Sequence, residues 1–241
     1  MSKYQGKKIL ITGAAKRLGR SFAIAAAQQG AHIFLHYSSS KDQALQTQTD
    51  IQNSGGTCDL IQADFRHPEK AIEAFQPIFD QHTIYALVNN ASIFLQNSLQ
   101  DTTMQDWNIH QAVNLSMPFL LTQAYANSAA NSEGRIINLL DWRALRPGKD
   151  HFAYTISKAG LAALTEASAL ALAPHFLVNG LALGAILPPS DGSPSDGIIR
   201  QVPAGRWAEV EEVVQTFLFL LEAPAYITGE IIHIDGGRHL V

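Results

Sequence analysis

The sequence is poor in cysteine, because Cys58 is the only one among 241 residues. One cysteine cannot close a disulfide within the chain, and it excludes the CxxC pairs of many zinc sites. The apolar run near the N-terminus is also too short for a secretory signal peptide. We therefore expect a cytoplasmic protein that folds without disulfides.

Long apolar runs and an excess of basic residues are lacking too. No stretch approaches the ~20 continuous apolar residues of a membrane-spanning helix, so no membrane is expected as a partner. The chain has 17 Lys and Arg against 21 Asp and Glu, a net charge of -4, which leaves no broad basic surface for nucleic acid. The nine histidines show no HExxH or clustered spacing, so no metal is expected. These absences favour a small-molecule ligand.

What the chain does have is an alternation of short aliphatic runs with longer helical patterns, which is typical of βαβ units. We expect one α/β domain over residues 1–241: a Rossmann-like, doubly wound parallel sheet of about seven strands with helices on both faces. The expected strands are Lys8–Thr12, Ala31–Tyr37, Cys58–Ala63, Ala86–Asn89, Arg135–Leu140, Val178–Ala182 and Ile231–Ile234.

Two other segments bear on function. A helix expected from about Phe152 to Ala173 is almost uncharged, so it lies in the core or meets another subunit. With the apolar C-terminus, it favours a homotetramer, a dimer being the alternative. Residues 184–206 are rich in Pro, Gly, Ser and Asp and predict a flexible loop. Because this loop follows a strand at the ligand edge of the sheet, we interpret it as a substrate lid; a disordered surface insertion is the alternative.

The stretch "ILITGAAKRLGRSFAIAAAQQGA" (9–31) combines a buried strand, a tight turn and an Ala-rich helix. Gly13 lets the backbone turn, and Gly19 lets the start of the helix pack closely. The free N–H groups and dipole of the helix N-terminus suit a phosphate. This context predicts dinucleotide binding, a merely structural turn being the alternative.

The end of the second strand indicates which dinucleotide binds. An NAD site commonly has Asp or Glu there, to accept a hydrogen bond from the ribose 2′-OH. This chain has "HYSSSK" (36–41) instead, and Lys16 and Arg17 stand in the glycine turn. The absence of a carboxylate and the positive charge favour a 2′-phosphate, so NADP(H) is the expected cofactor. The alternative is that Arg17 and Lys41 simply face solvent.

A second group of residues has the chemistry of proton transfer. Tyr154 and Lys158 are four residues apart, hence neighbours on one helical face. A nearby ammonium favours phenolate, so we expect Lys158 to lower the pKa of Tyr154. YxxxK is common by itself; here it follows the strand "RIINLL", whose carboxyl end belongs at the ligand crevice of a doubly wound sheet.

With these residues in place, the chain resembles the short-chain dehydrogenase/reductase family over nearly its whole length. The resemblance implies a single-domain NAD(P)(H)-dependent oxidoreductase that is usually a tetramer or dimer. The motifs that carry it are "TGAAKRLG" (12–19), Asp64 in "QADF", "NNAS" (89–92), Asn114 in "VNLSMPF", "YTISK" (154–158), "VNGLALG" (178–184) and "IDGG" (234–237).

The resemblance implies a role for each matching residue. Tyr154 corresponds to the proton donor, and Lys158 to the residue that lowers its pKa and holds the nicotinamide ribose. Asn114 corresponds to the anchor of a water relay, and Asn89 to the strand-end residue near the cofactor ribose. For Asn114 and Asn89, helix distortion and loop capping are the structural alternatives. The cofactor contacts implied are Gly13, Arg17, Leu18, Gly19, His36, Tyr37, Ser38, Ser40, Asp64, Asn90, Ala91, Tyr154 and Lys158.

Two departures from the family pattern narrow the expectation. The middle glycine of the usual three is Arg17, and the usual serine, 13 residues before the tyrosine, is Asp141. Together with "LHYSSS" (35–40), these departures resemble the pteridine reductase branch, including bacterial dihydromonapterin reductases. That branch implies a pterin substrate stacked by Phe94 and contacted by Arg17, Ser92, Asp141 and Tyr154. A core position is the alternative for Phe94.

The chemistry of Asp141 agrees with this narrower reading. An ionised aspartate can only accept hydrogen bonds and would repel the oxyanion that forms when a ketone is reduced. A pterin has ring N–H groups and an amine to donate, and reducing its C=N bond requires a proton at nitrogen. The alternative for Asp141 is capping, or an ion pair with Arg143, Arg146 or Lys149.

The expected function is therefore NADPH-dependent reduction of a dihydropterin to a tetrahydropterin, with Asp141, Tyr154, Lys158 and Asn114 as the catalytic residues. Dihydromonapterin, dihydrobiopterin and dihydrofolate are possible substrates. One alternative is a carbonyl reductase such as a 3-oxoacyl thioester reductase, which Asp141 disfavours. Another is a non-catalytic NADP(H)-binding regulator, which would have no need of the proton-transfer residues.

Overall fold

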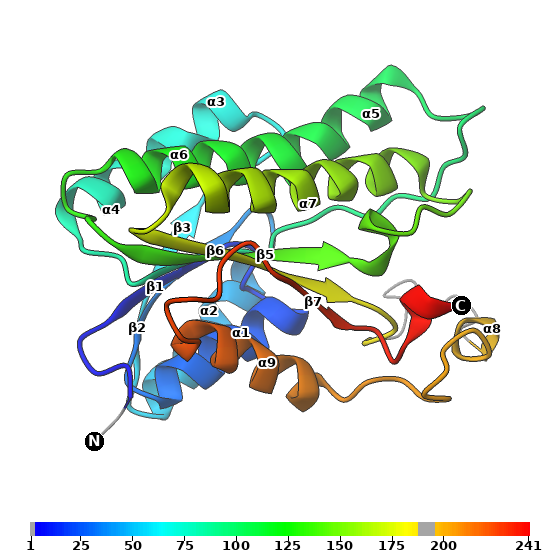
Figure 1. The fold of residues 1–241 in the computed structure, drawn as a ribbon. Helices are drawn as coiled ribbons and strands as arrows, with labels where there is room; N and C mark the ends of the chain where they lie inside the picture. The colour runs from blue at the N-terminus through cyan, green and yellow to red at the C-terminus, as the bar shows by residue number, and fades with distance from the viewer. Residues whose placement is uncertain (1–2, 188–195) are drawn as a thin grey trace.

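The computed structural model of the chain describes residues 3–187 and 196–241, which form a seven-stranded parallel sheet with helices on both faces (Figure 1). Every pair of neighbouring strands is parallel, and the order is β3-β2-β1-β4-β5-β6-β7. The predicted doubly wound fold is thus confirmed. The strands are β1 (Lys8–Ile11), β2 (His32–Tyr37), β3 (Thr57–Gln62), β4 (Ala86–Asn89), β5 (Gly134–Asp141), β6 (Phe176–Leu183) and β7 (Ile231–Ile234).

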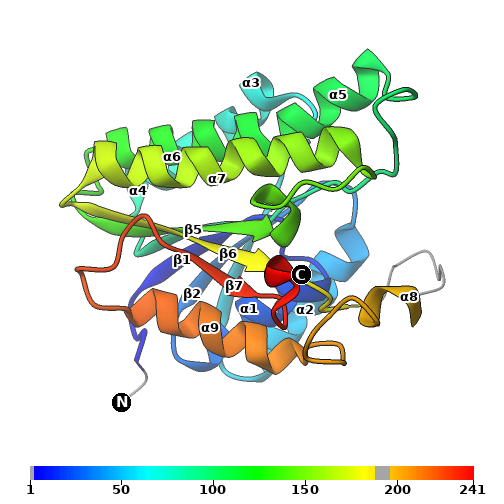
Figure 2. The same cartoon turned by 45° about the vertical axis from the view of Figure 1, so that its right-hand side comes forward.

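The helices form two layers (Figure 2). On one face lie α1 (Arg17–Gln28), α2 (Lys41–Asn53) and α9 (Val210–Glu222). The other face carries α3 (Pro68–Ala71), α4 (Gln76–Gln81), α5 (Met104–Gln111), α6 (Met117–Asn127) and α7 (Phe152–Leu172).

Both faces of the sheet are apolar because both are covered, as parallel sheets require. On one side, Phe22 of α1 stacks on Phe217 of α9 with 4.5 Å between ring centroids. On the other, Phe79 of α4 stacks on Tyr125 of α6 at 5.6 Å. These two fully buried clusters hold the sheet between them, so the positions of the strand ends are fixed by packing on both sides.

Strands β5 and β6 extend further than the sequence predicted. They pair over eight residues each, from Gly134 opposite Phe176 to Asp141 opposite Leu183. Asp141 is therefore the last residue of β5 rather than the first residue of a loop. Because all strands run in the same direction, the ends of β1, β4, β5 and β6 share the edge of the sheet where α7 begins (Figure 1).

Helix α7 matches the helix expected at about 152–173. It begins after His151, whose φ of 52° is in the left-handed region, and ends at Leu172, before Pro174, which cannot continue a helix. The expected lid at 184–206 lies partly outside the described residues. Of its described part, α8 (Asp196–Ile199) is a single short helical turn. No helix in the described segments has the length and apolar character needed to cross a membrane.

Candidate active site

The turn between β1 and α1 requires glycine at two positions. A Cβ on Gly13, whose φ is 63°, would lie 2.8 Å from the Cα of Ala91. A Cβ on Gly19 would lie 2.5 Å from the Nδ2 of Asn90. Both glycines therefore let the start of α1 approach the segment after β4 closely. Thr12 fixes that approach, because its Oγ1 accepts from the backbone N–H groups of Asn90 at 2.9 Å and Ala91 at 3.0 Å.

Arg17 stands where the family pattern has its middle glycine, and its backbone adopts a conformation typical of glycine. Its φ is 55°, in the left-handed region that favours glycine. It is also the first residue of α1, whose first turn contains no acidic residue. Lys16 precedes it, so two cationic side chains adjoin the helix N-terminus. This arrangement suits an anionic group at the helix end.

One cavity of about 900 Å³ runs along the carboxyl edge of the sheet. The expected site residues that do not line it are Asn89 and Asn114. The wall at the end of β2 contains three serines at 38–40 and no carboxylate from that strand end, which fits a dinucleotide carrying a 2′-phosphate. The expected residues that line it are Gly13, Arg17, Leu18, Gly19, His36, Tyr37, Ser38, Ser40, Asp64, Asn90, Ala91, Ser92, Phe94, Asp141, Tyr154 and Lys158.

His36 lies deep in this wall, with only 2% of its surface exposed. Its Nδ1 accepts from the N–H of Gly13 at 3.1 Å, its Nε2 lies 3.1 Å from the carbonyl of Ala63, and its ring stacks on Phe65 at 4.0 Å. Burial lowers the pKa of His36 to about 4, so the imidazole is neutral. Both nitrogens thus have protein partners, which gives His36 a structural role; its expected contact with the cofactor stays a prediction.

Asp64, the expected adenine contact, is paired with Arg66, which was not predicted from the sequence. Its carboxylate receives Nε and Nη2 of Arg66, the latter at 2.6 Å. The hydrogen bonds from Arg66 lower the pKa of Asp64, so it is ionised at neutral pH. Both residues line the same end of the cavity.

Tyr154, Asp141 and Lys158 meet where β5 ends and α7 begins. The Tyr154 hydroxyl donates to Oδ2 of Asp141 at 3.1 Å. The Lys158 ammonium donates to the carbonyl of Leu139, two residues before Asp141 on the same strand, at 2.6 Å. Tyr154 and Lys158 are 6% and 3% exposed. A phenol, a carboxylate and an ammonium therefore face one cavity with little access to water.

The expected lowering of the Tyr154 pKa is not found in this arrangement. Burial and the charge of Asp141 raise the Tyr154 pKa well above its usual range, so the phenol is protonated. Lys158 lies 5.9 Å from the centre of the Tyr154 ring, and its ammonium is bonded to Leu139 instead. Burial also lowers the pKa of Lys158 to about 8 and raises that of Asp141. The prediction was wrong because it considered only the ammonium of Lys158. The burial of Tyr154 and the nearer carboxylate of Asp141 both act in the opposite direction.

Asp141 has a capping role as well as its contact with Tyr154. Its Oδ1 accepts from the backbone N–H of Arg143 at 2.9 Å, at the start of the short helix η3 (Trp142–Ala144). The Arg143 guanidinium is 4.0 Å away, but its closer partner is Asp150 at 2.9 Å. One oxygen of Asp141 therefore makes the cap that was the structural alternative, and the other accepts from Tyr154; the role of Asp141 in catalysis stays a prediction.

Asn114 is fully buried in a π-helical segment, η2 (Ala112–Ser116), between α5 and α6. Its Oδ1 accepts from the N–H of Ile93 at 2.9 Å and from the hydroxyl of Ser92 at 3.2 Å. Its Nδ2 donates to the Ile93 carbonyl at 3.1 Å and to Ser157 at 3.0 Å. Asn114 thus joins the segment after β4 to α7; a water relay through it stays a prediction.

Phe94 is not a core residue, because 52% of it is exposed. Its ring stacks on His151 at 3.9 Å and meets the edge of Tyr154 at 4.6 Å. His151 was not among the site residues predicted from the sequence. No spacing rule marks it, since its place depends on the left-handed turn before α7 and on a ring 57 positions earlier in the chain.

Comparisons with known proteins agree with this geometry. A family model described as Enoyl-(Acyl carrier protein) reductase matches residues 13–239. The 3-oxoacyl-[acyl-carrier-protein] reductase FabG of Staphylococcus epidermidis is 31% identical over 242 residues, covering 97% of this chain and 99% of the relative. The similarity to it is therefore full-length.

Two solved structures show the same fold with a nucleotide bound. FolM Alternative dihydrofolate reductase 1 from Brucella canis, complexed with NADP, has a TM-score of 0.87 at 29% identity and covers 100% of this chain and 97% of its own. A short chain dehydrogenase from Burkholderia cenocepacia J2315 in complex with NADP has a TM-score of 0.89 at 29% identity, covering 98% and 99%. The chain belongs to the short-chain dehydrogenase/reductase family of oxidoreductases.

Proposed function

We propose that this protein reduces a dihydropterin to a tetrahydropterin with NADPH. The observation that carries the proposal is the hydrogen bond from Tyr154 to Asp141, at 3.1 Å, at the carboxyl end of β5. It puts an acceptor-only carboxylate at the position where a carbonyl reductase needs a donor for the developing oxyanion.

A pterin ring fits this pattern of donors and acceptors. Its exocyclic amine and ring N–H groups can donate to a carboxylate, and its flat ring can stack on the exposed face of Phe94. The edge of Phe94 toward Tyr154 would keep the stacked ring beside the phenol. Leu183, Ile186 and Leu187 add apolar surface to the lining of the cavity.

When bound, NADPH supplies a hydride from C4 of its nicotinamide ring. In a 7,8-dihydropterin the N5=C6 bond is reduced, with the hydride added at C6 and a proton at N5. Tyr154 holds that proton, since its raised pKa keeps the phenol protonated. Asp141 orients the hydroxyl. After Tyr154 has given its proton to the substrate, Asp141 can bind a new proton and pass it to Tyr154.

Lys158 and Asn114 act around this pair. The Lys158 ammonium, bonded to the Leu139 carbonyl, places positive charge at the base of the cavity, where it can hold the nicotinamide ribose. Asn114 fixes the Ser92 and Ile93 segment against α7 and so sets the height of the Phe94 ring over the cavity.

The cofactor assignment rests on charge. Lys16 and Arg17 adjoin the phosphate end of the cavity, and the serines at 38–40 replace the carboxylate that an NAD site commonly has. The NADP complexes of the Brucella and Burkholderia proteins support the same choice.

A 3-oxoacyl thioester reductase is the second candidate, because the Staphylococcus relative with that activity is similar over its full length. Asp141 argues against it for the electrostatic reason given above. A non-catalytic regulator is disfavoured by the intact Tyr154, Lys158 and Asn114.

A substrate panel tests the choice. The rate of NADPH oxidation is measured at 340 nm with dihydromonapterin, dihydrobiopterin, dihydrofolate and acetoacetyl thioester, for the wild type and for Tyr154→Phe. We expect turnover of one or more dihydropterins, lost in Tyr154→Phe while NADPH binding is kept. Turnover of the thioester without any dihydropterin would instead establish the carbonyl reductase, and no turnover with NADPH bound would favour the regulator.

We also propose a homotetramer. Apolar side chains on the outer surfaces of α6 and α7 are exposed in the single chain, including Phe119 at 44%, Ile156 at 37% and Leu170 at 86%. A helix pair with such a surface is suited to packing on a second copy. Light scattering on the purified protein separates tetramer from dimer, and a monomer would contradict the proposal.

A further inference from the structure

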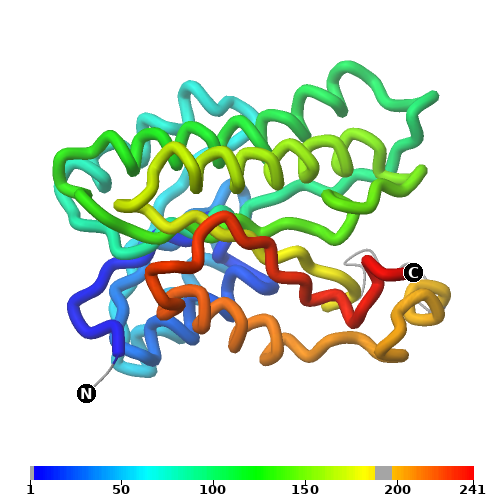
Figure 3. The backbone as a smooth tube through the Cα atoms, viewed as in Figure 1, coloured from blue at the N-terminus to red at the C-terminus, as the bar shows by residue number. Residues whose placement is uncertain are grey.

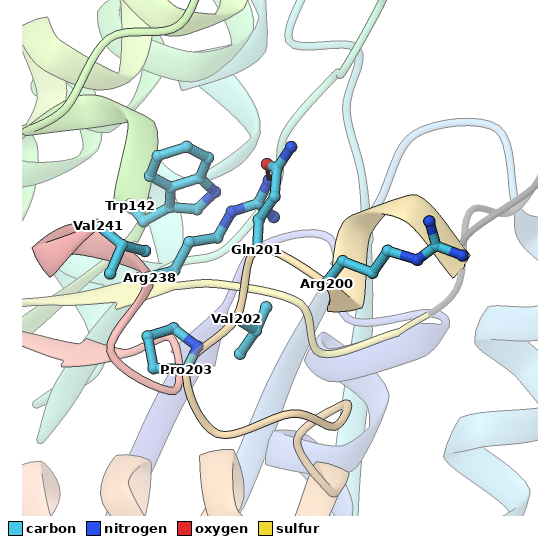
Figure 4. A pocket seen from close by; sticks show the side chains of 7 residues that line it. All are labelled: Trp142, Arg200, Gln201, Val202, Pro203, Arg238 and Val241. Carbon is cyan, nitrogen blue, oxygen red and sulfur yellow. Dashed lines mark hydrogen bonds between the residues drawn. The ribbon is translucent and has the colours of Figure 1, made fainter.

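The structure contains a second cavity, of about 530 Å³, whose lining residues are shown in Figure 4. Three segments line it: Trp142 of η3, residues 200–203 after α8, and Arg238 and Val241 near the C-terminus. These segments are far apart in sequence but meet beyond the ends of β6 and β7 (Figure 3). Two hydrogen bonds join these parts of the chain: the Ala204 N–H donates to the Gly236 carbonyl at 3.0 Å, and Nη1 of Arg146, which follows η3, donates to the His239 carbonyl at 3.1 Å.

Arg238 is the unusual group in this cavity. It is 8% exposed, and its guanidinium lies over the Trp142 indole, 4.3 Å from the ring centroid. Nη2 donates to Oε1 of Gln201 at 2.9 Å, whereas the buried Nε has no hydrogen-bond partner. Figure 4 shows the guanidinium, Gln201 and the indole gathered at one end of the cavity, while Arg200 points away from them.

The charge of Arg238 is not neutralised locally. Across residues 3–187 and 196–241, no carboxylate oxygen lies within 4.0 Å of its guanidinium, whereas Arg143, on the same indole, is paired with Asp150 at 2.9 Å. The nearby Asp235 is already engaged, accepting from the backbone N–H and the ring of His239, both at 2.8 Å. A buried cation with an unused donor is costly unless an anion completes it.

The cavity adjoins the reacting residues. Trp142, which forms its wall, directly follows Asp141, and Asp141 lines the larger cavity. Burial lowers the pKa of Arg238, as does the charge of Arg143, while the charges of Asp141, Asp150 and Asp235 oppose that change. Arg238 is thus within electrostatic reach of Asp141. A substituent on a pterin bound beside Asp141 would extend past Trp142 toward this guanidinium.

We propose that the second cavity is a subsite for a carboxylate on the substituent of the substrate, held by Arg238. The inference rests on the proposed function and specifies its substrate class: dihydropterins whose tail ends in an acid, as in dihydrofolate. A carboxylate matches the planar fork of a guanidinium, and Val202, Pro203 and the indole offer apolar surface to the linker before it. A neutral polyol tail could accept a hydrogen bond from Arg238 but would leave its positive charge without a counter-charge.

Substrate variants test the subsite without altering the protein. The kcat/KM of the wild type is compared for 7,8-dihydrofolate and for its diester, which keeps the linker and removes both charges. We expect the diacid to be preferred by about tenfold to a hundredfold, the range for a hydrogen-bonded charge. Equal values for the two substrates would overturn the proposal.

Arg238→Met links that preference to the residue. We expect the ratio of kcat/KM for diacid to diester to fall toward one, and Arg238→Lys, which keeps the charge but not the fork, to give an intermediate ratio. The control is Arg206→Met, because Arg206 is exposed, pairs with Glu212 at 2.7 Å and lines neither cavity. A ratio in Arg238→Met as high as in the control would contradict the assignment. Thermal melting of each variant identifies loss of fold.

A binding measurement separates this proposal from the proposed function. p-Aminobenzoylglutamate, which has the acid tail but no pterin, is titrated calorimetrically into the NADP-loaded wild type and Arg238→Met. Binding to the wild type alone supports the subsite, even if no dihydropterin is reduced and the proposed function fails. Binding to neither, or equally to both, would overturn the subsite, even if dihydropterins are reduced and the proposed function stands.

Discussion

The hydroxyl of Tyr154 donates a hydrogen bond to Oδ2 of Asp141 across 3.1 Å, while Oδ1 of the same carboxylate caps η3 through the Arg143 N–H. The carboxylate is therefore held from two sides, and it lines the same cavity as Tyr154. A side chain fixed in this way is organised before a substrate binds.

The specificity of the enzyme should change when this carboxylate is removed. We expect Asp141→Ser to lower kcat/KM for a dihydropterin by about tenfold or more and to raise activity on an acetoacetyl thioester, because a hydroxyl can donate to an oxyanion. Steady-state kinetics with both substrates measure the change. The control is Asp150→Ser, which removes a carboxylate bonded to Arg143 but not to Tyr154. A parallel loss on both substrates in Asp141→Ser would contradict the role given to Asp141.

The fold and most members of the site could be predicted because their signals are local. Gly13 and Gly19 lie within seven residues of each other where the chain passes from β1 to α1, and the pairing of Tyr154 with Lys158 follows from helical spacing. The alternation of strands and helices likewise depends on short windows of sequence. These features can be predicted without knowing which distant segments come into contact.

What could not be predicted depends on contacts between distant segments. The pKa of Tyr154 is set by burial and by Asp141, and neither its depth nor the bond of Lys158 to Leu139 is visible in a YxxxK pattern. The stack of Phe94 on His151 joins the segment after β4 to the start of α7. The Arg238 and Trp142 contact similarly brings the C-terminus to the end of β5. Part of the expected lid, residues 188–195, lies outside the described residues.

Protein stability should depend on pH through Asp141. Burial raises its pKa above the usual 3.8 in the folded state, so the folded protein binds the proton more tightly than the unfolded chain. The contribution of Asp141 to the free energy of unfolding is therefore largest below pH 3.8 and is lost as pH rises through the folded-state pKa. We expect Asp141→Asn to be more stable, relative to wild type, at about pH 7 than at about pH 3.5, because the effect begins at the usual pKa of 3.8.

Urea denaturation of both proteins at the two pH values measures this difference. Asp50→Asn is the matched control, because the hydrogen bond from Arg20, at 2.7 Å, lowers the pKa of Asp50 and gives the opposite sign. The wild type should gain stability over Asp50→Asn as pH rises from the lowered pKa of Asp50 to the usual value of 3.8, with no further gain above it. A difference between wild type and Asp141→Asn that does not change with pH would show that the carboxylate is not desolvated.

Catalysis should fall on the alkaline side as Lys158 loses its proton. Burial lowers the pKa of this ammonium to about 8, and its positive charge is needed to hold the nicotinamide ribose and to anchor the Leu139 carbonyl. We expect kcat/KM for NADPH to decline above about pH 8. The test is the pH profile of Lys158→Arg, whose guanidinium stays protonated throughout. This variant should be slower at every pH but lack the alkaline decline; the same decline in both proteins would assign it to another group.

The preference for NADPH over NADH should depend on the side chain of Arg17, and protein stability on its backbone conformation. Its side chain adjoins the phosphate end of the cavity, so both Arg17→Ala and Arg17→Gly should weaken NADPH binding by about tenfold or more, with a much smaller effect on NADH. The backbone φ of 55° distinguishes the two variants. Glycine adopts this conformation without strain, so Arg17→Gly should be more stable than Arg17→Ala by about 1 kcal/mol.

Fluorescence titration with NADPH and NADH, together with thermal melting, measures both effects. Lys16→Ala is the control for charge alone, because Lys16 precedes α1 with φ at −153°, an extended conformation open to any residue. Lys16→Ala should weaken NADPH binding. At position 16, glycine should not be more stable than alanine, in contrast to position 17. Equal losses of NADPH and NADH affinity in Arg17→Ala would place the 2′-phosphate elsewhere in the cavity, with Lys41 and the serines at 38–40 as the next residues to test.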